Sequence, residues 1–264
     1  MDDAAEHRRM MIDGYQIVAR VWAGPASPAR TPLLLVHGLG VSSRYMIPTA
    51  VRLSAYAPVY APDLPGFGAS SHPQRALSVA ELAGVLAGWM RAMRLERAVL
   101  LGNSMGCQVI AHVAVERPDL VERAILVGPT MDPDAGARAQ VGRLVADSFR
   151  EPVRYLPVLL GDYLRAGPRR VIATFRHALR DESFANYSRM SMPTLVVRGG
   201  RDPIAPQGWA KRLAGALPHG QLAVIPGAGH AANFNAPDEL VEVTRAFLDR
   251  SESGDSYARL SGAG

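Results

Sequence analysis

The stretch AVLLGNSMGCQVIAHVAVE, residues 98–116, decides the fold, because an apolar run passes through a glycine-bounded serine directly into a helical pattern. Residues 98–101 are continuously apolar, which is typical of a strand that is covered on both faces of a sheet. From Met105 to Glu116 the apolar side chains recur at helical spacing. Ser104 therefore stands at the turn between a buried strand and a helix.

The same alternation of strand and helix continues along the chain. Further short apolar runs predict buried parallel strands at residues 33–36, 59–61, 124–127, 194–197 and 222–225, and an alternating run predicts an antiparallel strand at residues 16–22. Apolar side chains at helical spacing predict helices over residues 82–93 and 240–247. This order predicts an α/β protein with a doubly wound, mostly parallel sheet.

One segment, residues 131–190, interrupts the pattern. It contains no convincing strand, but it has ten arginines and an apolar set that predicts helices. Because it falls between two strands, we expect a helical lid that rises from the carboxyl ends of the sheet, where ligands bind in open α/β folds. The predicted core is then residues 1–130 and 191–250, followed by a flexible tail rich in serine and glycine at residues 251–264.

Composition restricts the class of protein. A chain of 264 residues that is 48% hydrophobic and 20% charged can bury one large core. The single cysteine, Cys107, can form no internal disulfide, and no signal sequence or membrane span is evident, so we expect a cytoplasmic protein that binds no membrane. The basic residues are scattered and only 6% of residues are aromatic, which argues against nucleic-acid binding. The oligomeric state is left open.

The motif Gly102-Asn103-Ser104-Met105-Gly106 matches G-x-S-x-G, a pattern that becomes informative in its strand-to-helix context. Such a turn exposes the serine hydroxyl, while the flanking glycines let strand and helix approach closely. The helix N-terminus favours negative charge on a nearby substrate oxygen. A serine hydroxyl is a weak nucleophile, however, so a catalytic role requires a histidine base and a carboxylate that orients it.

Two loops at predicted strand ends supply these partners. His230 follows the strand at residues 222–225 in a glycine-rich loop, and Asp202 follows the strand at residues 194–197. The order serine, aspartate, histidine is one used by serine hydrolases. Asp132 and Asp134, which follow the preceding strand, are the alternative acids. The other histidines considered as bases lie in a helix, in the lid or in polar loops: His112, His177, His7, His72 and His219.

A second glycine-containing loop, His37-Gly38-Leu39-Gly40, follows the first buried strand. We expect the backbone N–H of Leu39 to form an oxyanion hole with that of Met105, and His37 to support the loop. Taken alone, the segment is equally compatible with an ordinary strand-to-helix turn.

Five motifs together resemble the α/β-hydrolase fold superfamily: HGLG at 37–40, DLPGFGAS at 63–70, GNSMG at 102–106, GGRD at 199–202 and GAGH at 227–230. The resemblance covers nearly the whole chain and implies a triad of Ser104, Asp202 and His230 with an oxyanion hole from Leu39 and Met105. The elbow and PGFG are also similar to hydrolases that cleave carbon–carbon bonds of ring-opened aromatics. Those enzymes commonly carry an aromatic residue after the histidine, where this chain has Ala231. Serine at position 104, where haloalkane dehalogenases and soluble epoxide hydrolases have aspartate, argues against both chemistries.

These features predict a carboxylic-ester hydrolase that needs no cofactor or metal and acts on a small or medium ester through an acyl-enzyme. The lid arginines suggest a carboxylate-bearing substrate, although solvated arginines are the commoner outcome. Cleavage of a carbon–carbon bond, a thioester or a lactone by the same residues is the alternative chemistry. A small-molecule receptor with little turnover is the alternative outside enzymes. The apolar side chains of the lid fit a small acyl or aromatic group: Met131, Leu159, Leu160, Tyr163, Phe175, Phe184, Tyr187 and Met190.

Overall fold

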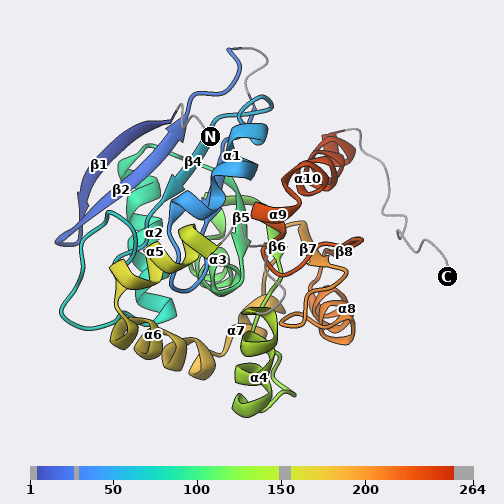
Figure 1. Ribbon diagram of the computed structural model, residues 1–264. Helices are drawn as coiled ribbons and strands as arrows, with labels where there is room; N and C mark the ends of the chain where they lie inside the picture. The colour runs from blue at the N-terminus through green and yellow to red at the C-terminus, as the bar shows by residue number, and fades with distance from the viewer. Residues whose placement is uncertain (1–4, 27–29, 149–155, 253–264) are drawn as a thin grey trace.

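An eight-stranded sheet runs through the centre of the molecule in the computed structural model, which describes residues 5–26, 30–148 and 156–252 (Figure 1). The spatial order is β1-β2-β4-β3-β5-β6-β7-β8. At one edge β1 (Glu6–Ile12) and β2 (Tyr15–Trp22) run antiparallel. The others are mutually parallel: β3 (Leu33–Val36), β4 (Val59–Pro62), β5 (Ala98–Asn103), β6 (Val121–Val127), β7 (Thr194–Gly199) and β8 (Gly220–Ile225). The predicted doubly wound, mostly parallel sheet is confirmed.

The central strands are apolar throughout because both of their faces are covered. Every residue of β3 and β5 is buried, and Leu34 pairs with Leu100 in the parallel register. Successive side chains of a strand point to opposite faces, so Leu34 joins one hydrophobic cluster and Leu35 joins the other. The two layers of helices therefore rest on two separate cores.

Helices cover both faces of the sheet. One core contains residues of α2 (Val79–Ala92), α3 (Met105–Glu116) and α8 (Gln207–Ala216). The other contains residues of α1 (Ile47–Leu53), α9 (Ala232–Asn235) and α10 (Pro237–Glu252). Because the central strands are parallel, the loops that follow β3, β5, β6, β7 and β8 all emerge at one edge of the sheet.

Between β6 and β7, within residues 131–190, the chain forms four helices and no strand in the part that the structure describes. These are α4 (Ala137–Ser148), α5 (Leu156–Ala166), α6 (Pro168–Arg180) and α7 (Ser183–Tyr187). Helices α5 and α6 pack against each other (Figure 1). We call residues 131–190 the insertion. These helices lie where the sequence pattern predicts helices and no strand.

Two segments differ from the sequence prediction. Strand β1 is not predicted, because its sequence EHRRMMI begins with charged residues and all of them except Ile12 are exposed or half-exposed. Helix α10 continues through Glu252, and the remainder of the predicted tail, residues 253–264, lies outside the described residues. Among the described residues, no helix is both long enough and apolar enough to cross a membrane.

Candidate active site

Ser104 occupies a strained turn between β5 and α3. Its backbone has φ 57° and ψ −122°, in the left-handed range that side chains rarely adopt. A Cβ atom on Gly106 would lie 2.4 Å from the carbonyl oxygen of Val36, and one on Gly102 would lie 2.7 Å from the carbonyl carbon of Gly106. Only glycine permits this close approach of strand and helix, which is the role predicted for both residues.

The loop that follows β3 lies against this turn. A Cβ atom on Gly38 would be 3.1 Å from the Cβ of Ser104. The buried His37 holds the loop, because its Nδ1 donates to the carbonyl oxygen of Gly38 at 2.8 Å and its Nε2 accepts from the backbone N–H of Leu64 at 2.9 Å. Burial lowers the pKa of His37, which keeps the imidazole neutral in this arrangement. His37 thus supports the loop from behind.

His230 and Asp202 form a buried hydrogen-bonded pair. His230 Nδ1 donates to Asp202 Oδ2 at 2.9 Å, while Asp202 Oδ1 accepts from the backbone N–H groups of Ile204 at 2.7 Å and Ala205 at 3.1 Å. Burial alone would raise the pKa of Asp202, but His230 and the two backbone N–H groups lower it below its usual range. The carboxylate therefore stays ionised and fixes the imidazole tautomer with the lone pair on Nε2.

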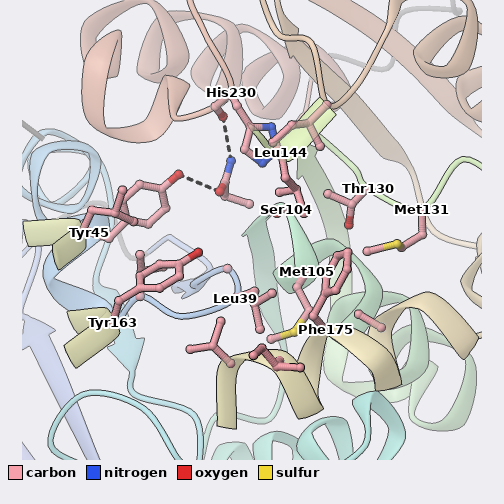
Figure 2. Close-up of a pocket in the computed structure, with 18 residues that line it drawn as sticks. Leu39, Tyr45, Ser104, Met105, Thr130, Met131, Leu144, Tyr163, Phe175 and His230 are labelled. Atoms are coloured by element: carbon pink, nitrogen blue, oxygen red, sulfur yellow. Dashed lines mark hydrogen bonds between the residues drawn. The ribbon is translucent and has the colours of Figure 1, made fainter. Parts of the chain in front are cut away.

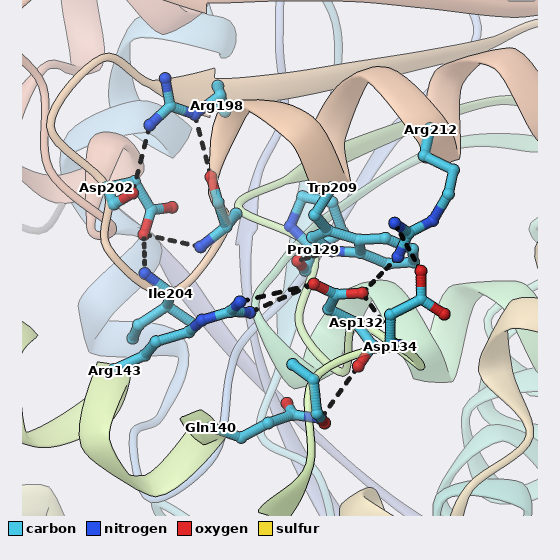
Figure 3. Close-up of polar contacts among 12 residues, drawn as sticks. Pro129, Asp132, Asp134, Gln140, Arg143, Arg198, Asp202, Ile204, Trp209 and Arg212 are labelled. Atoms are coloured by element: carbon cyan, nitrogen blue, oxygen red, sulfur yellow. Dashed lines mark hydrogen bonds and ion pairs between the residues drawn. The ribbon is translucent and has the colours of Figure 1, made fainter.

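The alternative acids have other partners. Asp132 accepts from Arg143 of α4 at 3.4 Å and also from Arg212 of α8, which in turn pairs with Asp134 at 2.8 Å (Figure 3). Arginines thus hold both carboxylates, and the structure brings Asp202 to the imidazole of His230.

Of the other histidines considered as bases, His112 on α3 bonds to Asp181 at 2.8 Å. His177 lies on α6, His219 precedes β8, and His7 lies on the edge strand β1. Cys107, in the first turn of α3, is buried, and burial raises the pKa of its thiol, which contacts the carbonyl oxygen of Gly102 at 3.2 Å. It is a packing residue and not a nucleophile.

Ser104 and His230 line the same cavity of about 300 Å³, and Figure 2 shows their side chains at the same end of it. Leu39 and Met105 line it as well. The core loops supply one side of the wall, and the insertion supplies the rest through Met131, Leu144, Leu159, Tyr163, Val171, Ile172, Phe175 and Ala178. No Asp, Glu, Lys or Arg is among the described residues of the lining. The cavity is therefore a largely apolar chamber with a serine and a histidine at one end.

The predicted apolar side chains of the insertion divide into groups. Met131, Leu159, Tyr163 and Phe175 line the cavity. Leu160 is 61% exposed, whereas Tyr187 and Met190 belong to the core and Phe184 packs against Trp209. None of the described arginines of the insertion lines the cavity; Arg143 pairs with Asp132, and Arg170 donates to the carbonyl oxygen of Arg75 at 3.2 Å.

A chain of polar contacts that is not evident from the sequence holds the backbone of His230. The hydroxyl of Tyr45 donates to Asn103 Oδ1 at 2.7 Å, and Asn103 Nδ2 donates to the carbonyl oxygen of His230 at 3.1 Å (Figure 2). Asn103 could have been found from its place directly before the serine in the G-x-S-x-G motif. Tyr45 carries no local signal, because its contact spans 58 residues of chain.

The fold and these loops define a class of protein, and a sequence comparison identifies it. The Alpha/beta hydrolase family matches residues 33–243, so the chain belongs to that family. It is therefore an α/β hydrolase, as the five sequence motifs indicate.

Individual relatives within the family have different names and activities. The chain is 24% identical over 259 residues to 2-(acetamidomethylene)succinate hydrolase of Mesorhizobium japonicum, covering 88% of this chain and 93% of that one. It is similar to a thermophilic esterase from Thermogutta terrifontis, with a TM-score of 0.78 and 25% identity over 93% of this chain and 99% of the other. The enol-lactonase of Burkholderia xenovorans LB400 shares the fold, with a TM-score of 0.77 and 21% identity over 92% of this chain and all of the other, 100%. Among the described residues, no three His, Cys, Asp or Glu side chains form a group that could hold a metal ion.

Proposed function

We propose that the chain is a serine hydrolase that cleaves a small or medium, uncharged carboxylic ester through an acyl-enzyme. The observation that carries the proposal is that Ser104 shares one apolar cavity with an imidazole held by the buried Asp202. Ser104 is the nucleophile, His230 the base, and Asp202 the carboxylate that fixes the tautomer. The N–H groups of Leu39 and Met105 form the oxyanion hole.

The reaction runs in two halves. His230 Nε2 takes the proton of the Ser104 hydroxyl as the oxygen attacks the ester carbonyl, and the tetrahedral oxyanion accepts hydrogen bonds from Leu39 and Met105. The imidazolium then returns its proton to the leaving alcohol, which gives the acyl-enzyme. A water that His230 deprotonates attacks this ester, and collapse of the second tetrahedral species returns the proton to Ser104 and releases the acid. No cofactor takes part.

The lining of the cavity supports an uncharged substrate. A carboxylate in an apolar cavity needs a paired positive charge, and no described arginine of the insertion reaches the lining. We therefore expect this chain to prefer a neutral acyl or aromatic ester, with the insertion acting as a lid over it.

Replacement of Ser104 by alanine tests the proposal. With p-nitrophenyl butyrate as substrate, Ser104→Ala should lower kcat by about three orders of magnitude or more, because only the oxyanion hole and binding remain. Ser188→Ala is the matched control, since Ser188 lies at the end of α7 on the surface and its hydroxyl donates to the carbonyl oxygen of Ala185. Undiminished turnover by the purified Ser104→Ala protein would remove Ser104 from the mechanism.

Cleavage of another bond by the same residues is the second candidate, and the likeness to 2-(acetamidomethylene)succinate hydrolase over 88% of the chain is the observation that favours it. A panel that presents one acyl group as an ester, a thioester, a lactone and a β-diketone separates the chemistries by kcat/KM. A protein whose Ser104 reacts with a fluorophosphonate but which turns over no member of the panel would instead be a receptor.

A further inference from the structure

A buried carboxylate on helix α5 of the insertion, Asp162, contacts the loop that contains Leu39. Ser42 lies three residues after Leu39, and its hydroxyl donates to Asp162 Oδ2 at 2.6 Å. Both side chains are removed from water, since Ser42 is 0% and Asp162 1% exposed. The contact joins residues 120 positions apart. It is therefore a tertiary connection between the insertion and the loop at residues 38–42.

A second contact of the same helix reaches this loop. Gly40 has φ +77°, and a Cβ atom built on it would lie 2.7 Å from the ring of Tyr163, the residue that follows Asp162. The ring thus rests directly on the glycine backbone between Leu39 and Ser42. Val41, between these contacts, belongs to the same hydrophobic cluster against which Leu159 of α5 packs.

A partly exposed arginine lies beside Asp162. Arg44 Nη1 lies 3.4 Å from Asp162 Oδ1, but the arginine side chain is 40% exposed. The hydroxyl of Ser42 also accepts from the backbone N–H of Arg44 at 3.3 Å, which caps the short helix at Ser43–Met46. A buried carboxylate is a costly way to pack a helix, because a leucine would avoid the desolvation penalty. What the carboxylate adds is a directional hydrogen bond that holds the Ser42 hydroxyl in one orientation.

We infer that Asp162 is a positioning residue for the oxyanion hole. By holding Ser42, it sets the loop at residues 38–42 so that the N–H of Leu39 faces the oxygen of the tetrahedral intermediate. The inference rests on the proposed function, because it requires catalysis through Ser104. It also gives the insertion a part in the chemical step, in addition to its part in the cavity wall.

The test compares two substitutions of Asp162 with one of Arg143, which holds another helix of the insertion, α4. Asp162→Leu preserves bulk but removes the acceptor of the Ser42 hydroxyl, so kcat for p-nitrophenyl butyrate should fall 10- to 100-fold while KM stays within about twofold. Asp162→Asn keeps an acceptor oxygen and should retain kcat within about threefold. Arg143→Leu removes the contact of α4 with Asp132 without touching the loop, and it should alter KM and leave kcat unchanged.

Circular dichroism and the thermal midpoint establish that each variant is folded. Should Asp162→Leu fail to fold, Ser42→Ala removes the same hydrogen bond from the other side and should lower kcat in the same way. A folded Asp162→Leu or Ser42→Ala protein with wild-type kcat overturns the inference, as does an equal fall in kcat for Arg143→Leu. Activity that survives Ser104→Ala would instead overturn the proposed function, so the two failures are distinguishable.

Discussion

Gly128, at the end of β6, offers a direct test of how closely the His230–Asp202 pair is packed. It has φ +56°, and a Cβ atom on it would lie 2.9 Å from His230 Nδ1 and 3.0 Å from Asp202 Oδ2. Ordinary van der Waals contact begins near 3.4 Å. In Gly128→Ala the histidine and the aspartate must therefore each move by about half an ångström, or the backbone of β6 must yield.

The expected magnitude has two parts. An alanine in the left-handed region costs about 1 kcal/mol, and forcing a methyl group into this packed site costs about 1–3 kcal/mol more. A displacement of 1 Å at a catalytic group can lower the rate about 100-fold, so half of that displacement should lower kcat about tenfold. Gly128→Ala should therefore lose about 2–4 kcal/mol of stability and about a factor of ten in kcat.

Gly14→Ala is the matched control. Gly14 has φ +83°, but no atom lies within 4 Å of a Cβ built there, so this variant has the backbone strain without the collision. Urea unfolding gives the stability of both variants, and p-nitrophenyl butyrate hydrolysis gives kcat. If the two lost equal stability and both kept wild-type kcat, the proposed packing of Gly128 against the histidine would be refuted.

Two further predictions concern stability. The pKa of His112 is raised, mainly by the hydrogen bond to Asp181 and also by Glu116. The protonated histidine therefore adds to the free energy of unfolding; this contribution is complete below the ordinary pKa of 6.5 and is lost as pH rises through the raised pKa of the folded state. Urea unfolding across this pH range should show the free energy of unfolding fall in wild type and not in Asp181→Asn. The Thr130 hydroxyl is buried with no hydrogen-bond partner among the described residues. Thr130→Val should therefore raise the free energy of unfolding by about 1 kcal/mol, as measured by urea unfolding. An unchanged or lower free energy of unfolding would show that the hydroxyl makes a hydrogen bond in the folded protein.

The parts of the fold that could be predicted from the sequence are those with local signals. The sequence of residues 98–116 predicts β5 and α3, because a strand that is buried on both faces needs an unbroken apolar run, and here a glycine-flanked serine ends that run. The antiparallel edge strand β1 escaped prediction because only its last residue, Ile12, is buried. A strand that is paired on one side and open to water on the other needs no apolar pattern.

The candidate site could likewise be predicted only where its residues have a local signal. Ser104, His230 and Asp202 follow strands, and parallel strands deliver their ends to one edge, so their convergence could be predicted. The order serine, aspartate, histidine fits Asp132 as well as Asp202, so what favours Asp202 in the sequence is the GGRD motif in which it lies and the resemblance that this motif supports. The physical reason for the choice is visible only in the structure, where Arg143 and Arg212 hold Asp132.

Contacts across long stretches of chain leave no local trace. Tyr45 reaches Asn103, and Asp162 reaches Ser42, through pairings that depend on how the insertion and the loops pack together. Neither aspartate nor tyrosine stands out from its neighbours in the sequence. Such residues become recognisable only when the tertiary arrangement places them beside a loop with a function.

The burial of Cys107 has a consequence for the conditions in which the protein can persist. The chain has no other sulfhydryl group, and this one is covered by protein and held in its protonated form. Oxidants and glutathione therefore find no accessible thiol on the native surface, and covalent dimers through a disulfide bond cannot form without unfolding. The native state is accordingly insensitive to thiol–disulfide exchange with its surroundings.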